Sequence, residues 1–99
     1  MSKLIGIVRA VYPKKFKAIF STDWGTTKTI RFGSAGMDDY LHTHDKAQRE
    51  RYRTRHRKDL QTEAAKTGMS AGALSWYILW GESTDFDTNL RYYKNHFGL

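Results

Sequence analysis

The sequence predicts a small α+β fold, in which an antiparallel β-hairpin or three-stranded sheet is packed by an arginine-rich helix and two C-terminal helices. In the first third of the chain, apolar and polar residues alternate in short runs, as they do in half-buried strands. From about residue 45 onward, apolar residues recur at helical spacing instead. Ninety-nine residues, 39% of them hydrophobic, are enough for one modest core, so we expect a single domain over residues 1–99.

Two alternating runs, 15–20 and 27–32, form the predicted hairpin, and the Asp23-Trp24-Gly25 segment between them is typical of a turn. The inward positions are Phe16, Ala18, Phe20, Ile30 and Phe32. The β-branched run 4–8 precedes Pro13, and we interpret residues 1–13 as an arm or an edge strand. A hairpin alone is unstable in water, so the sheet must pack against the helices.

Asp45 is the predicted N-cap of a helix that reaches about Leu60, with Gln48 completing a capping-box pattern. The segment 62–72 is small and polar and is predicted to be a loop. Residues 73–80 form the most apolar stretch and are interpreted as a short buried helix. A final helix should begin at an N-cap Thr84 and end at Gly98, with an apolar stripe of Phe86, Leu90, Tyr93 and Phe97.

The net charge of +7 is concentrated in one segment. Residues 46–58 contain seven Lys or Arg and one Glu, which is +6 of that total. Long runs of one sign are unusual on an ordinary solvated face, and arginine fits phosphate groups bidentately. We therefore expect a polyanion-binding helix whose contacts are Arg49, Arg51, Arg53, Arg55, Arg57 and Lys58.

Cations of the hairpin extend this patch if the outer face of the hairpin lies beside the helix. They are Lys15, Lys17, Lys28 and Arg31, with Lys14 at the edge. The alternative is that these lysines only prevent association between strand edges. The sequence leaves both interpretations open.

Other kinds of site have weaker support. The chain has no cysteine, which excludes thiolate metal sites and cysteine nucleophiles. His42 and His44 lie in a predicted loop, and together with His56, Asp38, Asp39 and Asp45 they lack a recognised ligand spacing. The Gly33–Gly36 segment lacks the Gly-Lys-Ser/Thr ending of a phosphate-binding loop. We expect no enzymatic activity, catalytic residue, metal, cofactor or small-molecule substrate. The apolar run near the N-terminus is too short for a signal peptide or a membrane span, so no membrane association is expected.

An ordered series of motifs resembles a small, poorly characterised protein family of the nucleocytoplasmic large DNA viruses, including giant viruses of algae. The resemblance runs from about residue 14 to residue 98 and rests on Lys28-Thr29-Ile30-Arg31-Phe32-Gly33, Asp39-Tyr40, His44-Asp45-Lys46, Arg51-Tyr52, Arg55-His56, Leu74-Ser75, Ile78-Leu79-Trp80 and Tyr93-Lys94-Asn95-His96-Phe97-Gly98. It implies a virus-encoded protein carried in the virion, present in the host cytoplasm or nucleus during infection. The family supplies no established activity.

We therefore expect a non-enzymatic virion protein that binds nucleic acid, with DNA favoured over RNA, without reading its sequence. The alternative is a minor capsid or inner-shell protein whose arginine helix docks on acidic surfaces of other viral structural proteins. In that alternative, the run 4–8 adds as a strand to a neighbour's sheet. A metal-dependent nuclease using the His/Asp segment is a much weaker third hypothesis.

Overall fold

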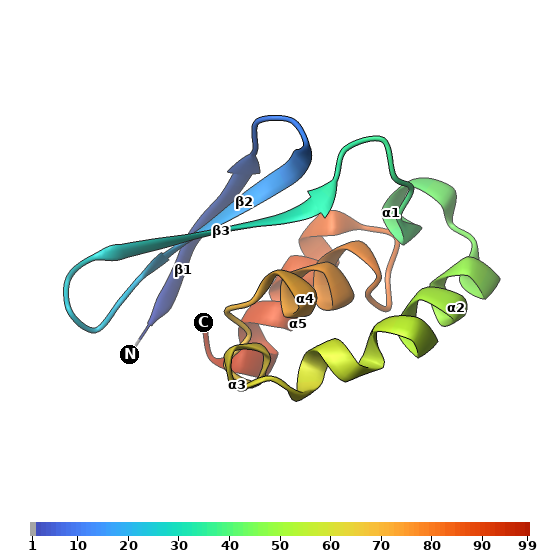
Figure 1. Cartoon of the computed structure of the whole chain (residues 1–99). Coiled ribbons are helices and arrows are strands. Elements are labelled where there is room, and N and C mark those ends of the chain that lie inside the picture. Colours follow the sequence, from blue (N-terminus) through green and yellow to red (C-terminus); the bar gives the residue numbers. More distant parts are fainter. Residues whose placement is uncertain (1) are drawn as a thin grey trace.

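The computed structural model describes residues 2–99 and consists of a twisted antiparallel sheet followed by a helical half (Figure 1). The strands β1 (Lys3–Arg9), β2 (Lys14–Ser21) and β3 (Thr27–Ser34) lie in the order β1-β2-β3. The helical elements of the described part are α1 (Tyr40–Thr43), α2 (Lys46–His56), the 3-10 helix η1 (Arg57–Gln61), α3 (Glu63–Lys66), α4 (Ala71–Leu74), the π-helical turn η2 (Ser75–Leu79) and α5 (Phe86–Phe97). The predicted α+β class, with a sheet packed by helices, is confirmed.

The predicted hairpin is also confirmed, because β2 and β3 pair as antiparallel neighbours with Phe16 opposite Phe32 and Ala18 opposite Ile30. The first strand, β1, pairs with the other side of β2. Residues 3–9 are therefore an edge strand of this sheet and not a free arm. Both β1 and β3 are edges, because each has a described neighbour on one side only.

The hydrophobic core lies between the inner face of the sheet and the C-terminal helices. Its fully buried side chains include Phe20 and Phe32 from the sheet and Leu74, Ile78 and Tyr93 from the helices. The segment 73–80 was expected to be a buried helix, and it is one, formed by α4 and η2. The outer face of the sheet carries exposed apolar side chains of β1, with Ile5 at 61% and Val8 at 46% exposure.

Helix N-caps explain where the helices begin. The Asp45 carboxylate accepts hydrogen bonds from the backbone N–H groups of Ala47 and Gln48, as the sequence predicted for this N-cap. The α-helix ends at His56, earlier than expected, and continues as the 3-10 turn η1 to Gln61. The N-cap expected at Thr84 is wrong: the carboxylate of Asp85 caps α5 by accepting from the Thr88 backbone.

Two further sequence predictions are wrong. The expected loop 62–72 contains α3 and the start of α4, which are capped by the hydroxyl groups of Thr62 and Ser70. Each helix is four residues long, too short for apolar periodicity to be visible. The segment around His42 is not a loop either, since His42 lies in α1 and His44 is its C-cap in the left-handed conformation.

Candidate nucleic-acid interface

The seven basic residues of the segment 46–58 do not share one environment. Arg49 is buried, with 9% of its surface exposed. Its Nε donates to the Gly81 carbonyl oxygen at 2.7 Å, and its two terminal nitrogens pair with Glu50 at 2.6 Å and Glu82 at 2.9 Å. Each of its three guanidinium nitrogens therefore has a partner within the protein. Arg49, expected to contact a polyanion, is therefore placed to hold α2 against the segment between η2 and α5.

Arg53 is also turned toward the protein. Its guanidinium carbon lies 4.4 Å from the centroid of the Trp76 ring, and Nη1 donates to the Trp80 carbonyl oxygen at 2.9 Å. Burial, followed by the nearby charge of Arg49, lowers the pKa of Arg53 from its ordinary value. Arginine stays charged in proteins despite such shifts, so stacking on Trp76 is a cation–π contact. Arg53 thus joins Arg49 as an attachment of the helix.

The remaining basic residues of this segment are exposed, and within residues 2–99 no ion pair involves any of them. They are Lys46, Arg51, Arg55, Arg57 and Lys58. Arg51 and Arg55 are one helical turn apart and lie on the same face of α2. We refer to these five exposed side chains, three from α2 and two from η1, as the cationic face. The acidic groups nearest to it in the chain are Asp45, Glu50 and Asp59. Asp45 caps α2, Glu50 pairs with Arg49, and Asp59 lies 2.8 Å from His56.

Aromatic stacking fixes the opposite side of α2. The Tyr52 ring stacks on Trp80 at 4.3 Å with an interplanar angle of 8°, and on His56 at 4.3 Å on the other side. Burial raises the pKa of Tyr52 to about 12, with a hydrogen bond to Ser75 acting in the opposite direction. The Asp59 carboxylate lies 2.8 Å from Nδ1 of His56. His56 is therefore half-buried beside Tyr52.

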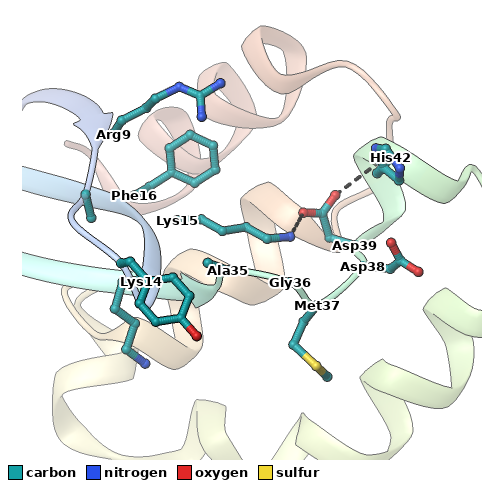
Figure 2. A pocket seen from close by; sticks show the side chains of 12 residues that line it. Arg9, Lys14, Lys15, Phe16, Ala35, Gly36, Met37, Asp38, Asp39 and His42 are labelled. Carbon is teal, nitrogen blue, oxygen red and sulfur yellow. Dashed lines mark hydrogen bonds and ion pairs between the residues drawn. The ribbon is translucent and has the colours of Figure 1, made fainter.

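The hairpin cations separate into three groups. The ammonium group of Lys15 pairs with the carboxylate of Asp39 at 2.6 Å, and Asp39 is also the N-cap of α1 (Figure 2). Because Asp39 is 6% exposed, this pair ties β2 to α1 and leaves Lys15 committed to the fold. Lys17 and Arg31 lie directly opposite each other on the outer face of the sheet.

Lys28 is not on the outer face where it was expected. In the β2–β3 register it lies opposite Phe20, whose side chain is fully buried. Directly opposite residues of an antiparallel pair project to the same face, so Lys28 extends from the inner side of the sheet beyond the core. The hairpin therefore does not form one continuous basic face.

The sequence did not reveal that a hollow joins the sheet to the cationic face. A hollow of about 570 Å³ lies between the start of β2, the loop after β3 and the end of α2. Lys14 and Arg55 line it, together with Tyr52, His56 and Asp38. Since Lys14 and Arg55 are 41 positions apart in the chain, no local pattern in the sequence could have placed them at one hollow.

The histidine and aspartate residues considered as metal ligands are dispersed. Among residues 2–99, no group of three or more His, Asp or Glu side chains is arranged to hold a metal ion. Asp39 and Asp45 act as helix N-caps, and a backbone carbonyl oxygen, that of Leu41, lies 3.1 Å from Nε2 of His44. None of the helices over residues 2–99 has the length and apolar character needed to cross a membrane.

Residues 10–56 match a family of unknown function (DUF5754). This segment runs from the turn before β2 to the last residue of α2, so it contains the hairpin and most of the arginine helix. No curated protein and no solved structure matches the chain. The description of the matching family names neither a source nor an activity, so the viral origin remains a prediction from the ordered motifs.

Proposed function

We propose that the protein is a non-enzymatic, virion-associated structural protein that binds nucleic acid, independently of base sequence, through the cationic face. The binding part of this proposal rests on one observation. Arg49 and Arg53 anchor α2 to the rest of the protein, while the five cations of the cationic face remain exposed without intramolecular ion pairs over residues 2–99. The viral part rests on the resemblance of the ordered motifs.

Rigid presentation of cations favours phosphate binding. Each neutralised phosphate releases condensed counterions, which provides the driving force for association with nucleic acid. A helix that is already held in place by Arg49, Arg53 and the Tyr52–Trp80 stack does not have to be ordered on binding. The cationic face can therefore contribute its contacts with a small entropic cost.

The side chains available on α2 favour phosphate contacts over base readout. Arginine can contact guanine as well as phosphate, and most other base readout uses the amide groups of Asn or Gln at the base edges of a groove. Gln48, the one amide side chain of α2, accepts a hydrogen bond from the Thr43 hydroxyl group through Oε1. The exposed cations then remain as the main polar groups of this face, and they recognise phosphates of any sequence.

A salt titration tests this proposal. Binding to random duplex DNA should weaken linearly on a log–log plot, with a slope of about −0.9 per phosphate contact. Replacing Arg51, Arg55 and Lys58 with alanine should reduce the slope by roughly three contacts. A charge-matched variant that replaces the exposed Lys3, Arg91 and Lys94 should keep the wild-type slope. Equal losses in the two variants would mean that net charge, and not the cationic face, determines binding.

A second candidate function is that of a minor capsid or inner-shell protein that docks on acidic protein surfaces. The open edge of β1 and its exposed Ile5 and Val8 favour a protein partner at the sheet. Size measurements of mixtures with shell proteins separate the two candidates. A stoichiometric complex that is lost in Val8→Asp, without DNA binding at low salt, would support the second candidate and contradict the first.

A further inference from the structure

We infer that the protein binds single-stranded nucleic acid in preference to a duplex, and that an unpaired strand lies in a groove between the β1–β2 turn and α2, with a base stacked on Tyr12. This inference rests on the proposed function and adds the class of nucleic acid and its path. The evidence for this inference is the pair of hollows beside the cationic face and the side chains that line them.

Two hollows of the structure adjoin each other, and together we call them the groove. The first, of about 560 Å³, is lined by Arg9 and Tyr12 from the β1–β2 turn region and by the loop 35–39. The second is the hollow that reaches Arg55 at the end of α2. They share six lining residues, which are Lys14, Lys15, Gly36, Met37, Asp38 and Asp39. The groove therefore leads from the β1–β2 turn to the cationic face.

The groove has a cationic character that suits a phosphate backbone. Lys15 and Asp39 neutralise each other where the two hollows adjoin (Figure 2). At the far end of the second hollow, Nδ1 of His56 lies 2.8 Å from the Asp59 carboxylate. Three further cations line the groove, Arg9, Lys14 and Arg55, against the carboxylates of Asp38 and Asp59. Lys14 belongs to both hollows, so it bridges the path between Arg9 and Arg55.

Tyr12 distinguishes a single strand from a duplex. Its side chain is 81% exposed in the turn between β1 and β2, and it lines the groove next to Lys14. In a duplex the base faces are covered by their neighbours and only the base edges are accessible. An exposed aromatic ring can therefore stack on a base only where that base is unpaired, which is how sequence-tolerant single-strand proteins bind. Each hollow has a volume within the range of small-ligand pockets, on the order of 300–1,000 Å³, which suits a single nucleotide unit.

The chain contains a matched control for Tyr12. Trp24 is 89% exposed and lies in the β2–β3 turn, at the opposite end of β2 and away from the helices (Figure 1). It lines neither of the two hollows. Tyr92, 53% exposed on α5, is a second aromatic side chain outside the groove.

The test compares oligothymidine with a DNA hairpin of the same number of phosphates, using fluorescence anisotropy at fixed low salt. Tyr12→Ala should weaken binding of oligothymidine by between about 5-fold and 100-fold and leave hairpin binding within twofold. Tyr12→Trp should retain binding, since it keeps a stacking ring. Trp24→Ala and Tyr92→Ala should change neither affinity by more than about twofold.

The outcomes separate this inference from the proposed function. If Arg51→Ala weakens oligothymidine binding but Tyr12→Ala does not, the cationic face stands and the groove is overturned. A loss confined to Trp24→Ala or Tyr92→Ala would also overturn the groove, because the stacking platform would lie elsewhere. If the wild type binds neither probe at low salt, the proposed function itself fails.

Discussion

The guanidinium group of Arg53 stacks on the ring of Trp76, with the guanidinium carbon 4.4 Å from the ring centroid, and thereby fixes a residue of the arginine run against the core. Arg51 and Arg55, its neighbours at two positions on either side, are exposed. Arginines of the same helix thus have different roles, since Arg53 packs against the core while Arg51 and Arg55 are exposed. This difference can be measured by comparing stability with binding.

Replacement of Arg49 should affect stability, whereas replacement of Arg51 should affect binding. Arg49→Ala removes a buried charge-assisted hydrogen bond and two ion pairs, so it should lower the free energy of unfolding by about 2 kcal/mol. Arg51→Ala should change stability by less than about 0.5 kcal/mol but remove about one phosphate contact from the salt slope. Urea unfolding and salt titration of the two variants check this; equal stability losses would contradict it.

Asn89 should be a critical polar residue of the core. It is 2% exposed; its amide nitrogen donates to the carbonyl oxygens of Ile78 and Ser83, and its oxygen accepts from the Ser83 backbone N–H. Asn89→Asp places a carboxylate against two carbonyl oxygens and should cost about 3 kcal/mol.

The exposed Asn95 on the same helix supplies the matched control. Asn95→Asp makes the same chemical change in water and should be nearly neutral in urea unfolding. A loss of equal size in both variants would show that added negative charge on α5, and not the buried amide, is responsible.

Tyr52 should make the protein sensitive to alkaline pH. Its pKa is raised to about 12 in the folded protein, mainly by burial, against an ordinary value of 10.0. The Tyr52 hydroxyl group therefore ionises at a lower pH in the unfolded chain than in the folded protein. Its contribution to the free energy of unfolding is present below pH 10 and is lost as the pH rises toward 12.

Tyr52→Phe keeps the stack on Trp80 and His56 but removes the hydroxyl group. It should lose less stability than the wild type between pH 10 and 12, as measured by urea midpoints at each pH. The comparison isolates Tyr52 because Tyr93, whose pKa is also raised by burial, is present in both proteins. Parallel pH profiles would rule out this role for Tyr52.

Asp38 should weaken binding in the groove because it opposes the phosphate charge next to Lys14. Asp38→Asn should strengthen oligothymidine binding by roughly two- to fivefold at low salt, with the gain disappearing near 0.15 M, where the Debye length is about 8 Å. Asp87→Asn, the same change at an exposed position of α5, should have no such effect. Equal gains in both variants would argue against a strand in the groove.

Local patterns were sufficient to predict the hairpin, the Asp45 N-cap, the buried segment 73–80 and the end of α5 at Gly98. Each of these depends on side-chain alternation, on a capping group or on a glycine within a few residues. The helices α3 and α4 were missed because four residues are too few to show a period. Thr84 and Asp85 are both good caps, and only the backbone conformation of Asp85 distinguishes them.

The candidate site was predicted in outline but not in its detailed membership. Arg49 and Arg53 were expected to contact a polyanion, yet their partners Gly81, Trp80 and Trp76 lie more than twenty positions later in the chain. The same limit applies to Lys15, whose partner Asp39 is 24 positions away. Long-range packing, which no local pattern records, decides which cations remain exposed.

The most direct test of the cationic face is an NMR titration of the labelled wild-type protein with random-sequence oligonucleotides at low salt. We predict that signals of Arg51, Arg55, Arg57 and Lys58 shift in proportion to bound ligand, while the Nε–H signal of Arg49 stays in place because its donors are occupied within the protein. Shifts confined to the outer face of the sheet and the β1 edge, or no shifts at all, would contradict the account.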